Sequence, residues 1–397
     1  MLLKKFMKTK KNYIKKKRII FFSDDPAGGV ILAIILKKIY TQHFVFPFFS
    51  GPSKKYLDKK NFGNTNLNQN ISKKKLENLI KEKRPDLMIT AAGIYNMHEH
   101  NARLIAKKNK IKSISIIDYW CEYSSRFKRK VKNTLQYSFP DWVFIMDKKS
   151  QKDFINETKF PINKTFISGS INLESIFKNF ILKKKSKKIQ SKQITITFFS
   201  DAFYTDSNKR FIKGNGTCFD KNGKSIFGYT PDVILNIIIK TIIEVNEKLN
   251  KKIKFIIKPH PRESVDTLVP IAQKFNKKDK NIKFYIELNR NSESLIFNSD
   301  LVFGMGSVAL FEAGIASKPS FSVQIGINRK KIYDPCISNY FNYSIKVDTK
   351  SKLRKILLEY LNNINSKKFS LKKKNVNLDK ALLTTISKIN EILLANE

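Results

Sequence analysis

Short runs of β-branched and aromatic residues alternate along the chain with longer stretches in which apolar residues recur at helical spacing. In the first half, the runs that predict strands are 18–23, 44–49, 86–91, 112–118, 142–147 and 165–168. The stretches that predict helices lie between most of these runs, at 29–40, 72–83, 97–109 and 148–157. This alternation is typical of βα units, so the first half is predicted to form one doubly wound domain around a parallel sheet.

A second series of the same kind follows a charged interruption. Residues 182–192 read LKKKSKKIQSK, which has neither strand nor helix spacing and is predicted to be a linker. The strands of the second series are predicted at 194–200, 254–257, 283–286, 301–303 and 320–324. The predicted organisation is α/β throughout, with a basic disordered arm, a Rossmann-like domain, the linker, a second Rossmann-like domain and C-terminal helices at 1–17, 18–181, 182–192, 193–350 and 351–397.

The formal charge of +44, from 77 basic and 33 acidic residues, would at first suit a nucleic-acid partner. The excess is nearly all lysine and is spread along the whole chain, whereas arginine, the residue suited to bidentate contacts with bases and phosphates, is sparse. The sequence also contains no recognised DNA- or RNA-binding motif. We therefore expect no nucleic-acid partner, and we expect the basic arm either to stay solvated or to rest on an anionic membrane.

Three separated cysteines, Cys121, Cys218 and Cys336, form no CxxC pair and predict neither a disulfide framework nor a zinc site. The basic N-terminal residues lack the apolar core of a signal peptide, and no apolar run is long enough to span a bilayer. A cytoplasmic protein is expected, with any membrane contact peripheral and at the inner membrane.

Ligands of open parallel sheets bind beyond the carboxyl ends of the strands, so the loops that follow the strands are the candidate sites. The first of these loops is SDDPAGG, in which Gly28 and Gly29 would let backbone amides approach a ligand. Asp24 and Asp25 would repel a phosphate, and they point instead to a hydroxyl-bearing acceptor or to a general base. The alternative for either aspartate is that it only caps the helix that follows.

The loop KPHPRE follows the strand predicted at 254–257. Its two prolines fix the backbone, and Lys258, His260 and Arg262 thereby direct cationic or protonatable groups to one place. This arrangement suits a diphosphate.

The turn GMGS follows the strand predicted at 301–303 and opens a helix. Gly306 and Ser307 would allow a phosphate to approach the free N–H groups of the helix start, and Glu312 on that helix could accept the hydroxyls of a ribose. The alternative is a packing turn.

Aromatic residues and carboxylates are mixed at 118–123, after the fourth predicted strand. Aromatic faces with polar partners suit a sugar, so Asp118 and Glu122 are candidate ligands, although dense aromatics also simply fill cores. His98 and His100, in the sequence HEH, are two residues apart and would not share a helical face, so no metal is expected there.

From residue 18 to about residue 360 the chain resembles GT-B glycosyltransferases and the related UDP-GlcNAc 2-epimerases. The likeness rests on the glycine loop after the first strand, on TFISGSINLE at 165–174, on KPHPRE at 258–263 and on SVALFEAGIASKP at 307–319. The resemblance implies two Rossmann-like domains that face each other across a cleft. It places Glu312 on the ribose, Ser307 and Gly306 on the diphosphate, and His260 and Arg262 facing the phosphates.

The His-Pro pair and the later serine turn are also similar to bacterial sialyltransferases and to capsule Kdo and polyol-phosphate transferases, which would imply a cytidine nucleotide. In the sialyltransferases an acidic pair just before a glycine supplies the catalytic base, and Asp24-Asp25 resembles that pair. Here Pro26 and Ala27 intervene before the glycine, which departs from the sialyltransferase pattern.

The function expected from these features is inverting transfer of a sugar from a nucleotide-sugar donor to a capsule- or lipopolysaccharide-type acceptor, either a glycan or a lipid-linked one. Asp25 or Asp24 would deprotonate the acceptor, while His260, Arg262 and Ser307 would stabilise the departing phosphate. Neither a metal nor a cofactor is expected, since the nucleotide sugar is a substrate. The alternatives are a nucleotide-sugar 2-epimerase centred on Glu122 and Asp118, and a basic nucleic-acid-binding protein.

Overall fold

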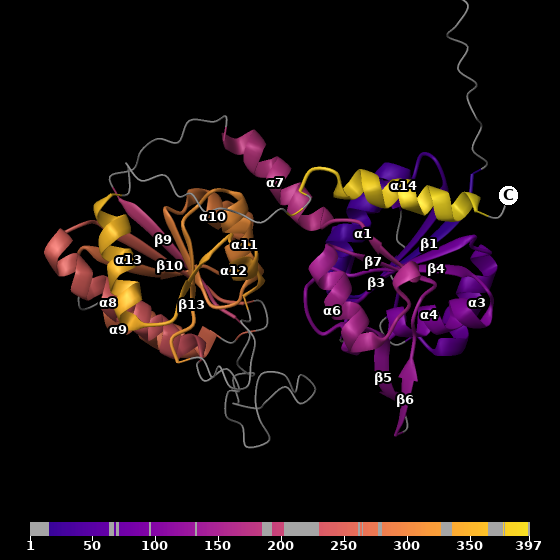
Figure 1. The fold of residues 1–397 in the computed structure, drawn as a ribbon, viewed down its shortest axis with the longest axis horizontal. Helices are drawn as coiled ribbons and strands as arrows, with labels where there is room; N and C mark the ends of the chain where they lie inside the picture. Colours follow the sequence, from indigo (N-terminus) through magenta and orange to yellow (C-terminus); the bar gives the residue numbers. More distant parts are fainter. Residues whose placement is uncertain are drawn as a thin grey trace, which may run out of the picture. The chain divides into compact units, whose positions relative to one another are not determined.

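The structure, a computed structural model, describes residues 16–62, 67–68, 71–94, 97–131, 133–184, 193–201, 230–260, 263, 265–276, 280–326, 336–363, 376 and 378–395. The chain divides into two compact units (Figure 1). Unit 1 comprises Met1–Ser175 and Asn377–Glu397, and unit 2 comprises Ile176–Val376. Most of the predicted arm and most of the predicted linker lie outside the described residues.

Unit 1 is built on a six-stranded sheet in which every neighbouring pair of strands is parallel, in the order β2-β1-β3-β4-β7-β8. The strands are β1 (Arg18–Ser23), β2 (Phe44–Phe49), β3 (Leu87–Ala91), β4 (Lys112–Ile116), β7 (Trp142–Ile145) and β8 (Thr165–Ile167). Each strand lies within one of the predicted runs, so the predicted doubly wound sheet is confirmed for this unit.

Alternate residues of the strands in unit 1 face two separate cores. Ile19 and Phe21 of β1 belong to a core that includes α1 and α14, whereas Ile20 and Phe22 belong to one that includes α3 and α4. This division follows from the two-residue period of a strand and explains why β1 is apolar at consecutive positions. The α-helices of this unit are α1 (Pro26–Ile39), α2 (Lys59–Phe62), α3 (Lys73–Lys83), α4 (His98–Lys108), α5 (Tyr123–Phe127), α6 (Lys148–Thr158) and α14 (Ala381–Leu394), with α7 (Ile171–Lys184) crossing into unit 2.

An antiparallel hairpin of β5 (Lys128–Val131) and β6 (Thr134–Tyr137) interrupts the βα alternation of unit 1. The sequence did not predict it, because KRKVKNTLQY contains few apolar residues and no apolar–polar alternation. Figure 1 shows the hairpin standing out from the sheet and helices of this unit.

Unit 2 repeats the architecture with a second parallel sheet, in the order β11-β10-β9-β12-β13-β14. Its strands are β9 (Ile194–Phe199), β10 (Ile253–Lys258), β11 (Ile282–Ile286), β12 (Leu301–Gly304), β13 (Ser320–Val323) and β14 (Ile345–Val347). Its other α-helices are α8 (Pro231–Leu249), α9 (Val269–Asn276), α10 (Ser292–Asn298), α11 (Val308–Ile315), α12 (Ile337–Tyr340) and α13 (Lys350–Asn362). Two Rossmann-like parallel-sheet units are therefore present, as predicted.

The C-terminal helices, expected as one segment at 351–397, belong to different units. Helix α13 packs against α8 in unit 2, through residues such as Leu357 in the core of that unit. Helix α14 instead returns to unit 1, where Ile389 joins the core and the Asn390 side chain lies 3.3 Å from the His43 ring. The chain also passes from unit 1 to unit 2 within α7, before the charged run where the sequence predicted the boundary.

None of the helices in the described part of the chain is both long enough and apolar enough to cross a bilayer.

The close approach of α1 to β3 gives a test of the fold of unit 1. A Cβ added at Gly28 would lie 2.3 Å from the Cβ of Ala91. We expect Gly28→Ala to lower the free energy of unfolding by about 1–3 kcal/mol, because neither backbone can retreat without disturbing the sheet. In Gly28→Ala combined with Ala91→Gly the contact is relieved, so urea denaturation should show a double variant more stable than the sum of the single effects. Additive losses would contradict this packing.

Candidate functional site

In unit 1 the candidate site lies where the strand order reverses. β1 pairs with β2 on one side and with β3 on the other, so the chain leaves β1 and β3 toward opposite sides of the sheet. Open α/β sheets bind their ligands beyond the carboxyl ends of the strands at this point. Asp24 and Asp25 follow β1, and Ala92 and Gly93 follow β3.

Asp25 caps the N-terminus of α1. Its carboxylate accepts hydrogen bonds from the backbone N–H groups of Ala27, at 2.8 Å, and Gly28, at 3.2 Å. Burial raises the pKa of Asp25 and the charge of Asp118 raises it further, whereas the two N–H groups act in the opposite direction. The capping alternative for Asp25 is therefore confirmed, and the raised pKa also makes this carboxyl better suited to proton transfer than an ordinary aspartate.

Asp24 is turned into the protein and is only 2% exposed. One carboxylate oxygen accepts a hydrogen bond from the Ser50 hydroxyl and lies 3.1 Å from Nδ1 of His98, and the other accepts one from the backbone N–H of Glu99 at 3.2 Å. Both oxygens thus bind protein groups at the end of β2 and the start of α4. Of the two aspartates predicted as the base, Asp25 is the one that the geometry favours.

Glu99 joins the two loops that meet at the switch point. Its carboxylate accepts the backbone N–H of Asp24 at 2.9 Å and that of Gly93 at 2.6 Å. Burial, together with the negative charges of Asp24 and Asp25, raises the pKa of Glu99 to about 8. A side chain at Gly93 would lie 3.0 Å from Oδ2 of Asp25, so glycine at this position lets the loops approach so closely.

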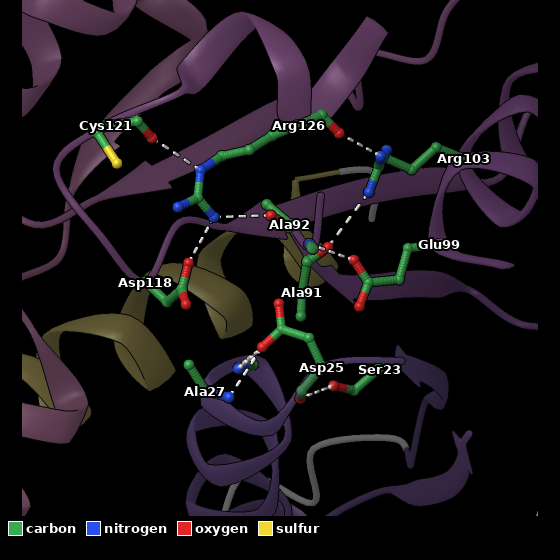
Figure 2. Close-up of polar contacts among 12 residues, drawn as sticks. Ser23, Asp25, Ala27, Ala91, Ala92, Glu99, Arg103, Asp118, Cys121 and Arg126 are labelled. Carbon is green, nitrogen blue, oxygen red and sulfur yellow. Dashed lines mark hydrogen bonds and ion pairs between the residues drawn. The ribbon is translucent and has the colours of Figure 1, made fainter. Parts of the chain in front are cut away.

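Asp118, at the end of β4, is held by a buried arginine. Nη1 of Arg126 lies 2.5 Å from Oδ1 of Asp118 and donates to the carbonyl of Ala92 at 2.7 Å. Figure 2 shows Asp25 between Asp118, with its arginine partner, and Glu99. The predicted candidates Asp25 and Asp118 are thus brought into one cluster of ionisable groups.

A second buried arginine supports this cluster from behind. Arg103, on α4, is 1% exposed and donates to the carbonyl oxygens of Ala91, Arg126 and Ser138, at 3.2, 2.9 and 2.8 Å. A buried guanidinium with this many acceptors fixes the backbone around it. Arg103 therefore ties the end of β3 to α5 and to the base of the β5–β6 hairpin.

The remaining predicted residues of unit 1 have other surroundings. Gly28 and Gly29 are buried where α1 packs closely on Ala91 and on Ser53, so the structure gives both glycines a packing role, and their contact with substrate stays a prediction. Glu122, with φ of 56°, lies in the left-handed region immediately before α5, and its role in sugar binding also stays a prediction.

In unit 2 one buried carboxylate, Asp201, lies at the corresponding switch point between β9 and β12, and a second, Glu263, lies in the loop after β10 on the other side of β9. Asp201, after β9, accepts the backbone N–H of Gly306 at 2.7 Å, and burial raises its pKa to about 6. Glu263 accepts the Ser200 hydroxyl at 2.8 Å and the backbone N–H of His260 at 3.1 Å. Burial raises the pKa of Glu263 to about 7.

The KPHPRE loop is only partly described. Lys258 ends β10, and its ammonium group donates to the carbonyl of Leu288 at 2.7 Å. His260 lies beside Glu263 through its backbone, whereas Arg262 lies outside the described residues. The loop is thus at the predicted place on the sheet, and its contacts with phosphate remain a prediction.

The GMGS turn leads into α11 as predicted. Ser307 caps the helix, with its hydroxyl oxygen accepting the backbone N–H of Ala309 at 3.3 Å. Glu312 is 6% exposed, and burial raises its pKa to about 7 although a hydrogen bond with Ser292 opposes the shift. Gly306, Ser307 and Glu312 therefore lie on one turn and helix, whereas a ribose contact by Glu312 stays a prediction.

Across the described residues, no group of three or more histidine, cysteine, aspartate and glutamate side chains is arranged to hold a metal ion.

Comparisons of the structure give a consistent result over nearly the whole chain. No protein-family model matches the sequence, and no curated protein does. UDP-GlcNAc 2-epimerase from Methanocaldococcus jannaschii is 17% identical, with a TM-score of 0.62 over 94% of this chain and 98% of that one. UDP-GlcNAc 2-epimerase from Neisseria meningitidis, bound to UDP-GlcNAc, is 13% identical, with a TM-score of 0.60 over 95% and 100%. Alr3699/HepE from Anabaena, in complex with UDP and glucose, is 12% identical, with a TM-score of 0.53 over 95% and 99%.

The chain has the GT-B-like fold of the UDP-GlcNAc 2-epimerases. This agrees with the resemblance that the glycine loop, the KPHPRE loop and the α11 segment indicated. At these identities the likeness establishes the fold, while the reaction has to be argued from the residues themselves.

Three buried charges of this GT-B-like fold were not predicted from the sequence as members of the site: Glu99, Arg103 and Asp201. Arg126 and Glu263 were noted with the aromatic segment after the fourth predicted strand and with the KPHPRE loop, but no role was predicted for either. A charged residue in a sequence is ordinarily exposed, and only the tertiary structure shows that these five are buried. The one usable signal was the HEH segment, because a polar cluster directly after a predicted strand lies at the ligand-binding edge of the sheet.

The raised pKa of Asp201 predicts a pH dependence of stability. The folded protein keeps this proton up to a pH of about 6, whereas the unfolded chain releases it near 3.8, so the contribution of Asp201 to stability falls as the pH rises through that window. Asparagine can still accept the Gly306 N–H but has no proton to lose. We expect Asp201→Asn to gain on the order of 2 kcal/mol relative to the wild type between pH 4 and pH 7.

Urea denaturation at several pH values measures this difference. The matched control is Asp266→Asn, at an exposed aspartate of the same unit, whose stability should change with pH as the wild type does. A difference between Asp201→Asn and the wild type that is independent of pH would show that Asp201 is ionised in the folded protein.

Proposed function

We propose that the protein is an enzyme that inverts the configuration at one carbon of the sugar in a nucleotide sugar, as a 2-epimerase does. The observation that carries the proposal is the cluster of Asp25, Asp118 and Glu99 at the switch point of unit 1, with raised pKa values for Asp25 and Glu99. Further support comes from solved structures of similar fold, most of which are named UDP-GlcNAc 2-epimerases.

The chemistry of inversion requires more than one protonatable group near the sugar. The C–H bond at C2 is broken on one face of the ring, and its electron pair forms a C1=C2 double bond as the nucleoside diphosphate leaves C1. A proton then adds to C2 from the other face as the diphosphate returns to C1, so a base and an acid are both needed. Asp25 and Asp118 are close enough for the charge of Asp118 to raise the pKa of Asp25, so one can hold a proton while the other is ionised. In this proposal Asp25 takes the proton, and Arg126 keeps Asp118 in place.

Unit 2 supplies the nucleotide site in this proposal. Glu312 accepts the ribose hydroxyls, and the start of α11 at Ser307 offers N–H groups to the phosphates. His260 and Lys258, from the loop after β10, add positive charge on the other side of β9. The carboxylate of Asp201 competes with a phosphate for the N–H of Gly306, so binding is expected to displace it from that group or to protonate it.

A second candidate, glycosyl transfer, is favoured by the position of Asp25 itself. A transferase needs one base for the acceptor hydroxyl, and a partly buried aspartate with a raised pKa provides one. HepE from Anabaena, which has a similar fold, was also solved in complex with UDP and glucose. The two candidates differ in one respect, since an epimerase needs no acceptor.

The nucleotide site predicts stabilisation by UDP. A ligand that binds only the folded state raises the melting temperature, and at a hundredfold excess over Kd it adds about 2.7 kcal/mol. We expect UDP to raise the melting temperature of the wild type and to have little effect on Glu312→Gln, because the neutral amide is a weaker acceptor for the ribose. Glu247→Gln, at an exposed position on α8, should keep the full response. Equal responses from both variants would remove Glu312 from the site.

The proposed reaction predicts turnover without an acceptor. UDP-GlcNAc incubated with the full chain alone should yield its C2 epimer, which proton NMR separates from the starting sugar. Asp25→Asn should lower kcat by at least about a hundredfold, because the amide still caps α1 but cannot take a proton. Asp153→Asn, at the half-buried ion pair with Lys149 on α6, is the control and should leave kcat unchanged.

Unchanged UDP-GlcNAc without acceptor, together with stabilisation by UDP, would contradict the epimerase and leave the transferase. Neither turnover nor stabilisation would contradict both candidates.

A further inference from the structure

None of the other strands in the described part of the chain pairs with the β5–β6 hairpin, whose two strands form a sheet by themselves. Lys128 pairs with Tyr137, Lys130 with Leu135 and Val131 with Thr134, in a two-stranded ribbon. Such a ribbon is only marginally stable unless its faces are covered or its base is anchored. Figure 1 shows it extending beyond the body of unit 1, and Lys130, Val131, Thr134 and Leu135 at its outer end are exposed.

The exposed residues of this hairpin are of two kinds, apolar and basic. Val131, Leu135 and Tyr137 are 37%, 52% and 49% exposed, so three apolar or aromatic side chains of this short hairpin are exposed. The sequence KRKVKNTLQY at 128–137 contains basic residues and no acidic one. Opposite residues of an antiparallel pair share a face, so Lys130 and Leu135 project from the same side.

We propose that the β5–β6 hairpin is a docking element for an anionic lipid bilayer, with Leu135 and Tyr137 entering the interface and the lysines binding the lipid headgroups. Apolar and tyrosine side chains flanked by lysine stems are the chemistry that suits a bilayer interface. The absence of acidic residues from the hairpin makes its charge complementary to anionic lipids.

Two other partners suit this surface less well. Another β-strand would have to pair along edges of only four residues that carry lysines, and short, lysine-bearing edges disfavour such pairing. Single-stranded RNA would need a free aromatic face for stacking. The ring of Tyr137 is already stacked on Phe139, at 5.9 Å between centroids, with the ammonium group of Lys128 over it at 5.7 Å.

The base of the hairpin is fixed to the ionisable cluster of unit 1. Nη2 of Arg129 donates to the carbonyl of Gly93 at 2.9 Å. The N–H of the same glycine donates to the carboxylate of Glu99. Nε2 of His100 lies 3.4 Å from Oε1 of Gln136 on the second strand. From Arg129 to Val131, the end of β5, the strand spans only about 7 Å at ordinary rise. Docking would therefore hold the loop of Gly93 close to the membrane surface, whichever of the two reactions the cluster performs.

The test is co-sedimentation of the full chain with lipid vesicles. We expect binding to phosphatidylcholine vesicles that contain about one-third phosphatidylserine, and none to phosphatidylcholine alone. Because each basic residue near an anionic surface contributes about a fivefold factor, Lys130→Glu should weaken partitioning by roughly tenfold or more. Leu135→Ser should weaken it at unchanged charge, since the apolar contact is lost.

Matched controls separate the hairpin from the general basic charge of the chain. Lys355→Glu, exposed on α13, and Leu383→Ser, 64% exposed on α14, should bind as the wild type does. Thermal melting checks that all four variants are folded. The proposal is overturned if the wild type does not bind anionic vesicles, or if Lys130→Glu weakens binding no more than Lys355→Glu. Binding that a short single-stranded RNA displaces, and that Leu135→Ser leaves intact, would also overturn it in favour of nucleic acid.

Discussion

The carboxylate of Glu99 holds the candidate site of unit 1 together. It accepts one backbone N–H from the loop after β1 and another from the loop after β3, and so joins the two loops that diverge at the switch point. The negative charges of Glu99, Asp24 and Asp25 repel one another, and burial strengthens this repulsion because it removes the screening by water. Arg103 and Arg126 offset that repulsion without neutralising Asp25 directly, which leaves Asp25 with a pKa above its ordinary range. A carboxyl group that transfers protons near neutral pH needs a raised pKa of this kind.

The two units share a sheet topology, but the buried carboxylates at their switch points have different partners. Each has a parallel sheet whose order reverses beside its first strand, and each buries a carboxylate at that point. In unit 1 the carboxylates lie near the buried guanidinium groups of Arg103 and Arg126. In unit 2 the carboxylate of Asp201 accepts a hydrogen bond from the backbone N–H of Gly306, in the turn before α11. The start of a helix favours anions at this place. A phosphate that binds in this turn would compete with the Asp201 carboxylate for the N–H of Gly306. The affinity of the proposed nucleotide site should therefore depend on the protonation state of Asp201.

The sequence was a good guide to the strands and a partial one to the site. The strands could be predicted because a sheet covered on both faces needs apolar residues at consecutive positions, as in the run from Ile19 to Phe22. Asp25 and Asp118 could be proposed because they follow predicted strands. Glu99 could not, because its burial depends on the packing of α4 against the ends of β1 and β3, which no local pattern records. The hairpin could not be predicted because most of its residues are polar and exposed, so its sequence lacks the apolar run that predicts a buried strand.

In the proposed reaction, Asp25 removes a proton from the sugar of a nucleotide sugar. The most direct measurement is solvent exchange: the full chain is incubated with UDP-GlcNAc in deuterium oxide, and the sugar is analysed by NMR and mass spectrometry. We expect deuterium at C2 of the sugar with the wild type and none with Asp25→Asn, because the group that protonates C2 on the opposite face carries a proton from the solvent. Deuterium incorporation that continues at the wild-type rate in Asp25→Asn would contradict the role of Asp25. A sugar that never acquires deuterium would contradict the proposed reaction itself.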